Sequence, residues 1–236
     1  MPQPEQVRSM FARIAGRYDL LNRILSLGID RRWRRRTVCA AGELAGRLVL
    51  DACCGTGDLA RDFARAGARV VGVDFTPQML GRAGPKLAGG RPVHLFVQGD
   101  ALRLPVASGC ADVAAVAFGL RNLSDPDAGL RELARAVRPG GRVLVLEFAT
   151  PPGRIVGALY RLYFTRLLPL VGGLVSGDPG AYRYLPETVL AWPSPDELEA
   201  RFLRAGLEGC GYRLLSGGIA CLHWGRVPGA AAGELE

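Results

Sequence analysis

The sequence predicts an α/β fold in which an open, mainly parallel β-sheet carries helices on both faces. Residues 47–51 form a short apolar run that ends in a carboxylate, and the turn Gly55-Thr56-Gly57 follows, without a Cβ at two positions where a ligand could approach the backbone. Residues 70–73 form a second buried run that ends at Asp74, about twenty residues past the glycines, where a ribose-binding acid is expected. The two strands and the helix between them therefore predict a βαβ unit of the Rossmann type that holds a nucleoside.

Two cofactors could use this turn. The spacing Gly55-x-Gly57-x-x-Ala60 satisfies the loose dinucleotide fingerprint of NAD enzymes, which alone is weak evidence. The spacing Asp51-x-x-x-Gly55-x-Gly57 instead resembles the first motif of the class I S-adenosylmethionine-dependent methyltransferases. We favour S-adenosylmethionine on this motif. A turn without any ligand is disfavoured, because packing alone does not explain an acid at the end of each of two adjacent strands.

Length and composition indicate one globular domain. A chain of 236 residues suits a single α/β domain with an attachment, and 49% hydrophobic with 22% charged residues is globular composition without a signal peptide. The six cysteines include no C-x-x-C pair and are accompanied by two histidines, so neither a metal site nor a disulfide framework is indicated. Reduced core cysteines of this kind predict a cytoplasmic protein.

The net charge of +8 is concentrated at the amino terminus. Residues 1–42 hold nine arginines against three acidic residues, a balance of +6. Apolar residues from Val7 to Leu25 recur at intervals of three and four, which predicts an amphipathic helix or a broken pair of helices. Residues 30–38 place five arginines around Trp33, a pattern compatible with binding to nucleic acid, with anionic lipid or with a solvated helix face.

Further strands complete the sheet. We expect a helix over 77–87, a third strand over 92–97 and a fourth over 111–117. The segment Gly99-Asp100-Ala101 follows the third strand and therefore lies at the same carboxyl edge as the glycine turn, where ligands of open α/β sheets bind. A helix over 126–137 and a Pro-Gly-Gly turn lead into the fifth strand.

The last third of the chain predicts a lid and a closing hairpin. Residues 155–175 are the most apolar stretch, but their arginines, proline and paired glycines favour a lid helix over a membrane span. A capped helix from Ser194 to Gly206 precedes an antiparallel pair over 207–215 and 217–225.

With these segments placed, the chain resembles the family of ubiquinone and menaquinone biosynthesis C-methyltransferases over residues 7–225. The stretches that carry the resemblance are Phe11-x-x-Ile14-Ala15-x-x-Tyr18-Asp19-x-x-Asn22, Gly55-Thr56-Gly57-Asp58, Phe118-Gly119-Leu120-Arg121-Asn122, Leu146-Glu147-Phe148, Gly177-Asp178 with Tyr182-x-Tyr184-Leu185, and Gly217-Gly218-Ile219-Ala220 with His223-x-Gly225. Cys53-Cys54 departs from the small residues common before Gly55. Ala117 stands where some members have serine, which removes one hydroxyl contact to the cofactor.

The resemblance implies the class I methyltransferase fold, a Rossmann-like seven-stranded sheet with an antiparallel last strand. It divides the chain into a helical cap (1–42), a methyltransferase domain (43–226) with a lid insertion at about 151–190, and a disordered tail (227–236). The residues expected to contact S-adenosylmethionine are Asp51, Gly55, Thr56, Gly57, Asp74, Phe75, Asp100, Ala101 and Ala117.

The reaction implied is transfer of the methyl group to a ring carbon of a prenylated quinol, giving menaquinol without a metal. Such a carbon becomes nucleophilic when the adjacent phenol, with an ordinary pKa of about 10, loses its proton, so a base or a cation is needed. Candidates are Asp58 as base and Arg121 as the cation that stabilises the oxyanion. Tyr18, Asn22 and His223 are candidates for the walls of the quinol pocket, and each has packing as its alternative role.

Several alternatives stay open. The substrate could be the 2-methoxy-6-polyprenyl-1,4-benzoquinol of ubiquinone biosynthesis, and the assembly could be a homodimer. The arginine cluster favours an RNA methyltransferase, but the fourth strand ends without Asn/Asp-Pro-Pro-Tyr and no Pro-Cys supplies a nucleophile, so we expect no nucleic acid partner. A non-catalytic adaptor would be expected to lose the cofactor residues that this chain keeps. The basic amino terminus and residues 155–175 together predict peripheral contact with an anionic membrane surface.

Overall fold

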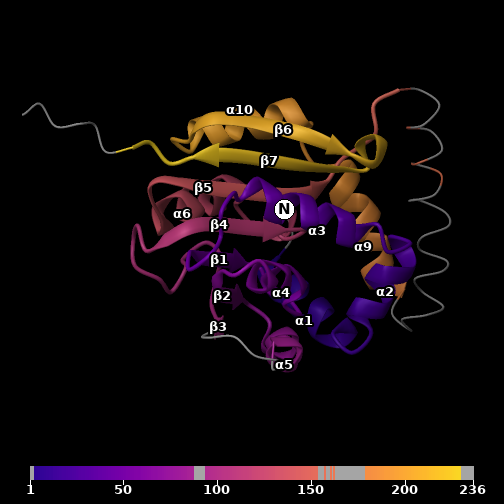
Figure 1. The fold of residues 1–236 in the computed structure, drawn as a ribbon. Coiled ribbons are helices and arrows are strands. Elements are labelled where there is room, and N and C mark those ends of the chain that lie inside the picture. The colour runs from indigo at the N-terminus through magenta and orange to yellow at the C-terminus, as the bar shows by residue number, and fades with distance from the viewer. Residues whose placement is uncertain are drawn as a thin grey trace, which may run out of the picture.

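One mixed β-sheet organises the chain. The computed structural model describes residues 3–87, 94–153, 157, 160, 162 and 179–229. Within this part of the chain, seven strands form a sheet in the order β3-β2-β1-β4-β5-β7-β6 (Figure 1). The strands are β1 (Leu48–Ala52), β2 (Arg69–Asp74), β3 (His94–Gln98), β4 (Ala111–Ala117), β5 (Val137–Phe148), β6 (Glu208–Leu215) and β7 (Ala220–Arg226). Strands β1 to β5 pair in parallel, and β7 is antiparallel to both β5 and β6, which confirms the predicted sheet.

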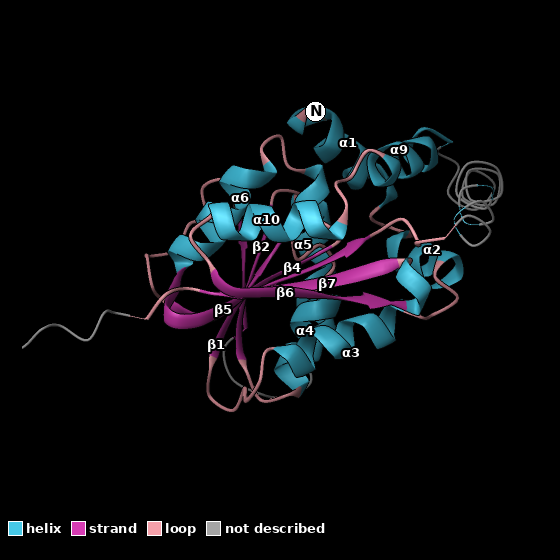
Figure 2. Ribbon diagram, turned by 90° about the horizontal axis from the view of Figure 1, so that it is seen from above, coloured by secondary structure: helices cyan, strands magenta, loops and turns pink. Residues whose placement is uncertain are grey.

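Helices cover both faces of this sheet (Figure 2). Helices α3 (Asp30–Ala40) and α4 (Asp58–Arg65) lie on one face, and α6 (Pro126–Ala136) and α10 (Pro195–Arg204) lie on the other. The other described α-helices are α1 (Pro4–Ile14), α2 (Tyr18–Leu25), α5 (Pro77–Leu87) and α9 (Pro179–Leu190).

Each face of the sheet has its own hydrophobic core. On the α4 face, Phe63 packs in a cluster with Leu144 of β5, and on the α10 face Phe202 packs in a cluster with Val143 and Val145 of the same strand. Strand β5 is therefore apolar on both sides, as expected for a central strand of a covered sheet. Burying each of these large side chains contributes about 1.5–3 kcal/mol to the stability of the fold. The sheet therefore holds the loops at its carboxyl edge in fixed positions.

Most of the expected segments agree with the structure. The amphipathic amino terminus is broken into two helices, because α1 ends at Ile14 and α2 begins at Tyr18. The predicted cap of α10 is a capping box: Ser194 Oγ accepts from the Glu197 N–H at 3.3 Å, and Glu197 Oε2 accepts from the Ser194 N–H at 2.7 Å.

Two expectations fall on residues that the structure leaves undescribed. The segment 155–175, Gly177-Asp178 and residues 230–236 lie wholly or almost wholly outside the described residues, so the lid and the tail remain predictions. Among the helices of the described residues, none is long and apolar enough to cross a membrane.

Helix α3 has an inner side that packs on the core. The indole of Trp33 is only 4% exposed, and its ring centroid lies 6.0 Å from that of Phe118 and 6.2 Å from that of Phe148. Its Nε1–H donates to Ser216 Oγ at 2.8 Å. Trp33 therefore anchors α3 to the sheet rather than meeting a partner.

The same helix divides the arginine cluster in two. Arg34 is 7% exposed and forms ion pairs with Asp30 at 2.5 Å and with Asp62 at 3.0 Å. The interpretation of five arginines as one partner-binding cluster is therefore wrong for Arg34, because its charge is neutralised inside the protein. The exposed members of the cluster are Arg31, Arg32, Arg35 and Arg36.

Candidate active site

The glycine turn after β1 is held in a left-handed backbone conformation. Cys53, Gly55 and Gly57 have φ angles of 53°, 55° and 77°. A Cβ on Gly57 would lie 3.0 Å from the Ala83 Cβ and 3.2 Å from the Phe96 ring, so this glycine lets α5 and β3 pack closely. A Cβ on Gly55 would meet no protein atom within 4 Å and would project into open space, which is where a ligand can approach the backbone.

Asp74 at the end of β2 shapes the next wall of the site. One carboxylate oxygen accepts from the Gly55 N–H at 2.8 Å, and the other accepts from the Thr76 N–H at 2.8 Å. Burial raises the pKa of Asp74, against the opposing effect of these two backbone donors. A carboxylate offers about four acceptor sites, so lone pairs remain for hydroxyl groups of a ligand in the pocket.

The carboxyl ends of four strands meet at one pocket with about 850 Å³ of empty space, part of it open to solvent. The predicted residues that line it are Gly55, Asp74, Phe75, Asp100, Ala101, Ala117 and Tyr18. The structure thus brings together half of the fourteen residues selected from the sequence, including six of the nine expected to contact the cofactor.

Helix α1 forms a wall that the sequence analysis did not assign to the site. Pro4, Val7, Arg8 and Phe11 line the pocket, and the Arg8 guanidinium lies 5.2 Å from the centroid of the Phe75 ring. A cation at this distance over an aromatic face is attracted by the ring. The periodicity of α1 indicated an apolar face but not what that face would cover, so only the tertiary structure reveals this contact.

Three predicted cofactor residues shape the turn from behind. Asp51, Thr56 and Gly57 do not line the pocket. Asp51 is 1% exposed and accepts from the Ala60 N–H, and burial raises the pKa of its carboxyl to about 8. Thr56 is 2% exposed and bonds to Asp19. The expectation of direct contacts is therefore corrected to a supporting role for the side chains of Asp51 and Thr56 and for the backbone of Gly57.

Asp58 is placed away from the pocket. It begins α4, and its carboxylate forms ion pairs with Arg61 at 3.3 Å and with Arg34 at 3.7 Å. Both of its oxygens face guanidinium groups, and Asp58 is not among the residues that line the pocket. The geometry therefore does not support the predicted role of Asp58 as the base.

Arg121 lies just beneath the pocket wall made by its neighbours Phe118 and Asn122. It is 8% exposed, and its Nη1–H donates to Glu147 Oε2 at 2.8 Å and to the Phe118 carbonyl at 2.6 Å. Its Nε–H is buried without a hydrogen-bond partner among the described residues. An unsatisfied buried donor costs free energy. Arg121 itself does not line the pocket, so its charge would act on a ligand there through the wall and not by direct contact.

Two tyrosine hydroxyls lie near this guanidinium. Tyr18 lines the pocket and bonds to the Asn22 side chain, and the Tyr184 hydroxyl donates to Asn122 Oδ1 at 3.0 Å. Burial raises the pKa of both phenols, while the charge of Arg121 acts in the opposite direction. Asn22 itself does not line the pocket and instead orients Tyr18.

His223 lies on the opposite side of the sheet, under α10. It is 2% exposed, its Nε2 is 3.0 Å from the Pro195 carbonyl oxygen, and its ring stacks near Phe202 and Tyr212. Burial lowers its pKa to about 4, so it is a neutral core residue. The structure does not bring His223 to the quinol pocket, and the packing alternative describes its position.

Residues 2–227 match the sequence model of the ubiE/COQ5 methyltransferase family. The chain belongs to this family. It is 50% identical over 222 residues to the demethylmenaquinone methyltransferase of Thermus thermophilus, covering 93% of this chain and 100% of the relative. It is 49% identical over 219 residues to the protein of the same name from Deinococcus radiodurans, covering 92% and 90%. The predicted family and methyltransferase activity are confirmed, and with them S-adenosylmethionine rather than NAD as cofactor.

Solved structures support the fold. The [4+2]-cyclase SpnF superposes with a TM-score of 0.69 at 17% identity over 97% of both chains. An S-adenosylmethionine-dependent methyltransferase from Thermotoga maritima superposes with a TM-score of 0.65 at 17% identity, covering 93% of this chain and 99% of that one. At this identity the likeness concerns the fold alone.

The pocket fits the cofactor of this family. The open space at Gly55 admits a ligand against the backbone, and Asp74 keeps acceptor capacity for two ribose hydroxyls. Asp100 uses one oxygen for the Leu102 N–H at 2.9 Å and adds a second carboxylate to the same wall. The residues that would hold S-adenosylmethionine are therefore Gly55, Asp74, Phe75, Asp100 and Ala101, with α1 covering them.

Proposed function

We propose that this chain methylates the ring of a prenylated demethylmenaquinol to give menaquinol in menaquinone biosynthesis. The observation that carries the proposal is the 43–50% identity, over at least 92% of the chain, to relatives named demethylmenaquinone methyltransferase. The pocket supports it, because an apolar and aromatic wall adjoins the carboxylates expected to hold the cofactor. Phe11 and Phe118 belong to that wall.

Arg121 is the residue that we assign to activation of the quinol. S-adenosylmethionine, when bound, supplies an electrophilic methyl group, and the protein must make the ring carbon nucleophilic. A fixed guanidinium lowers the pKa of a hydroxyl beside it, so a larger fraction of the quinol is ionised without a dedicated base. The positive charge of Arg121, which lies beneath the pocket wall, then stabilises the phenolate oxygen as its charge develops.

Tyr18 is assigned to holding the second quinol oxygen, and Tyr184 to fixing the Asn122 side chain in the pocket wall. Because burial raises the pKa of both phenols, they stay protonated near neutral pH and do not act as bases. Tyr18 donates to the quinol, whereas the single O–H of Tyr184 is donated to Asn122 Oδ1. Asn22 orients Tyr18. The aromatic faces of Phe11 and Phe118 exclude water from the reacting carbon.

We further propose that the enzyme meets its lipid substrate as a peripheral protein on an anionic membrane. The exposed arginines of α3 supply positive charge, at about 1 kcal/mol per residue near such a surface. Attachment of this kind weakens at high salt, because the surface potential is screened within about 8–10 Å at physiological ionic strength.

One assay tests the reaction. Purified protein is incubated with radiolabelled S-adenosylmethionine and a lipid extract from a strain that lacks the enzyme, with a benzoquinol precursor and total RNA in parallel tubes. Label is expected in the naphthoquinol fraction. Label in the benzoquinol alone would contradict the assigned substrate, and label in RNA alone or in no fraction would contradict the proposed function.

A further inference from the structure

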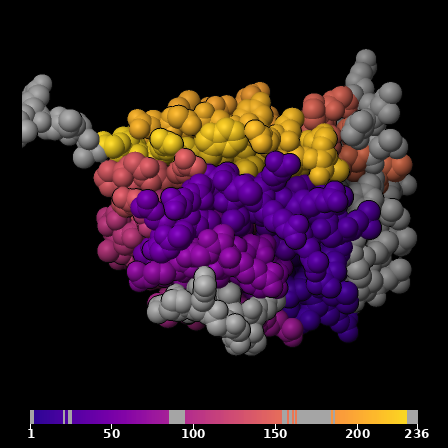
Figure 3. All heavy atoms as spheres, viewed as in Figure 1, coloured from indigo at the N-terminus to yellow at the C-terminus, as the bar shows by residue number. Residues whose placement is uncertain are grey.

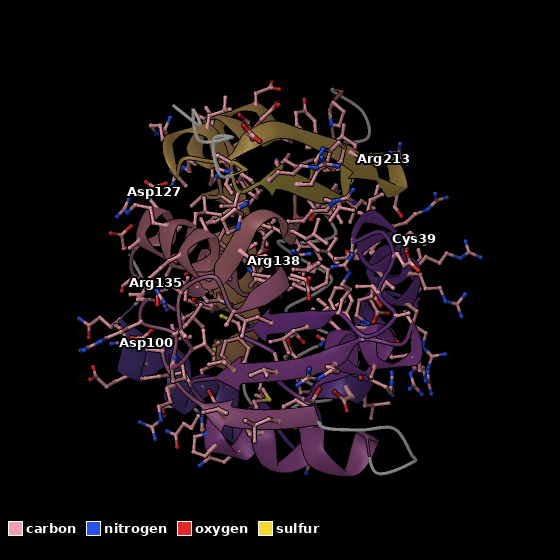
Figure 4. All side chains as sticks on the ribbon, turned by 60° about the vertical axis from the view of Figure 1, so that its left-hand side comes forward. Cys39, Asp100, Asp127, Arg135, Arg138 and Arg213 are labelled. Carbon is pink, nitrogen blue, oxygen red and sulfur yellow. The ribbon has the colours of Figure 1, made fainter. Side chains whose placement is uncertain are left out.

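A second hollow lies on the α3 face, at the end of the sheet away from the pocket. It holds about 1,370 Å³ of empty space, part of it open to solvent, and arginines from four separate elements line it. They are Arg36 of α3, Arg142 of β5, Arg213 of β6 and Arg226 of β7. We call this the arginine hollow. Figure 4 labels Arg213 and Cys39, which both line it, well away from Asp100 of the cofactor pocket.

The positive charges in the arginine hollow are poorly compensated. Arg36, Arg213 and Arg226 form no ion pair with any residue that the structure describes. Glu208 is the one acidic residue among the described residues that line the arginine hollow. It lies on β6 directly opposite Arg226 of β7, but the two side chains form no ion pair. A net charge of about three therefore converges on one concave surface.

The strand register places two of these arginines directly opposite each other. Arg142 of β5 is directly opposite Arg226 of β7 in the antiparallel ladder, so both side chains leave the sheet on the same face. Like charges directly opposite each other destabilise a sheet, and a bound anion would offset that repulsion. Arg142 is also fixed in place, because its Nη1–H donates to the Ala40 carbonyl at 2.6 Å.

We propose that the arginine hollow binds the phosphate of an anionic lipid headgroup. Arginines from four separate elements line one hollow, which suits a compact anion such as a phosphate, whereas a nucleic acid strand needs cations spaced along its backbone. The exposed arginines of α3 continue the positive surface at the rim, as expected for a site that faces many anionic groups and not one dissolved ion. Figure 3 shows α3 beside the β6–β7 hairpin on a single face.

This inference rests on the proposed use of a membrane-embedded substrate, and it assigns a specific contact to that attachment. Leu222 and the Trp224 ring form an apolar floor beneath the charges. Trp224 is held flat over β6, because a Cβ on Gly211 would come within 2.9 Å of its ring. An apolar floor below a cationic rim matches the chemistry of a phosphodiester carried on a glycerol ester.

The test compares two variants with the same change in charge. The hollow variant Arg213→Gln/Arg226→Gln removes two charges from the site, and the control Arg131→Gln/Arg204→Gln removes two exposed charges from α6 and α10 on the opposite face of the sheet. Binding to vesicles of phosphatidylcholine with 30% phosphatidylglycerol is measured by co-sedimentation, with pure phosphatidylcholine as reference. Thermal unfolding followed by circular dichroism verifies that both variants are folded.

We expect the hollow variant to lose tenfold or more in binding to the anionic vesicles, since each arginine near such a surface contributes about fivefold. The control variant is expected to lose less than threefold. Glu208→Gln should strengthen binding, because it removes the carboxylate from the wall. Equal losses in both double variants, or absence of wild-type binding to anionic vesicles, would overturn the proposal in favour of diffuse attraction or no attachment.

Two further experiments distinguish a failure of the proposed lipid site from a failure of the proposed methyl transfer. Methyl transfer to a detergent-solubilised short-chain quinol should be unchanged in the hollow variant, so failure of the site leaves the enzyme assay intact. Single-stranded RNA and inorganic phosphate at constant ionic strength serve as competitors. If the hollow variant loses RNA binding and keeps vesicle binding, or if millimolar phosphate displaces RNA but not vesicles, the lipid assignment is wrong.

Discussion

Thr56 in the glycine turn donates a 2.6 Å hydrogen bond from its Oγ1 to Asp19 Oδ1 of α2. This bond joins the amino-terminal helices to the turn that faces the cofactor. The position of α1 and α2 is therefore coupled to the shape of the site, although neither Thr56 nor Asp19 touches the pocket.

Replacing Thr56 with valine should weaken cofactor binding without direct loss of a ligand contact. A hydrogen bond to a charged group contributes about 1.5–3 kcal/mol. Because only part of this energy is coupled to cofactor binding, the dissociation constant for S-adenosylmethionine should rise by up to about tenfold in calorimetry. Hydrogen exchange of residues 18–25 should become faster. Ser108→Ala, which removes an exposed hydroxyl bonded to Arg135, is the matched control. Unchanged affinity together with unchanged exchange would show that the bond couples nothing.

Asp74→Ala should weaken the binding of S-adenosylmethionine by tenfold or more. The change removes an acceptor from the pocket and also releases the Gly55 and Thr76 N–H groups that the carboxylate holds. Asp74→Asn separates the two effects, because its single amide oxygen can still accept from one of the two backbone N–H groups while the negative charge is lost. An Asp74→Ala protein that binds with wild-type affinity would remove this residue from the cofactor site.

Arg121→Gln should lower turnover with little effect on cofactor affinity, because its role belongs to the developing phenolate. The single variant also leaves Glu147 buried and unpaired, which costs about 3–5 kcal/mol of stability. The double variant Arg121→Gln/Glu147→Gln should recover much of that stability but not the turnover. Recovery of both in the double variant would mean that Arg121 only maintains the fold.

His223 should make the protein less stable in acid. Its folded pKa of about 4 is below the ordinary 6.5, so the unfolded chain binds the proton first as the pH falls. Stability is therefore lost between pH 6.5 and pH 4, by about 3 kcal/mol in total from this group. Urea unfolding at pH 7 and at pH 4 measures this loss, and the free energy of unfolding of the wild type should fall by about 3 kcal/mol more than that of His223→Gln. The raised pKa of Asp51 also makes stability depend on pH, but this contribution is the same in both proteins and cancels. Parallel losses in the two proteins would contradict the assignment of His223 as a neutral core residue.

Neighbouring arginines of α3 should respond differently to the same substitution. Arg34→Gln removes the partner of Asp30 and Asp62 in a buried setting and should cost about 3 kcal/mol, whereas Arg35→Gln at an exposed position should change stability by about 0.5 kcal/mol at most. Chemical denaturation measures both. Similar losses of stability in the two variants would show that the buried ion pairs of Arg34 contribute no more to the free energy of unfolding than the solvated charge of Arg35.

Local patterns were sufficient for the sheet and for part of the site. Gly55, Asp74 and Asp100 each lie at or just after the carboxyl end of a strand, so parallel pairing alone brings them to one edge. Asp58 could not be placed in this way, because a partner on α3, Arg34, determines where its carboxylate points.

Other contacts depend on which face of an element is covered. His223 and Trp224 are adjacent on β7, yet the first lies under α10 and the second borders the arginine hollow. Alternation along a strand is visible in the sequence, but the side chosen by each residue follows from the topology. Arg8 and Phe11 illustrate the same limit, since only the folding of α1 back over the cofactor edge brings them to the pocket.

The wall that α1 adds to the pocket has a practical consequence for how the protein is handled. Pro4 lies in that wall, so a fusion partner or affinity tag placed directly before it would crowd the mouth of the cofactor site. A tag attached after the last described strand, β7, would start at the opposite end of the sheet from the pocket. Preparations that differ only in the placement of the tag should therefore differ in their affinity for S-adenosylmethionine. The carboxyl-terminal tag is the appropriate choice for the measurements of cofactor affinity, and it is removed before vesicle binding is measured, because β7 ends at Arg226 of the arginine hollow.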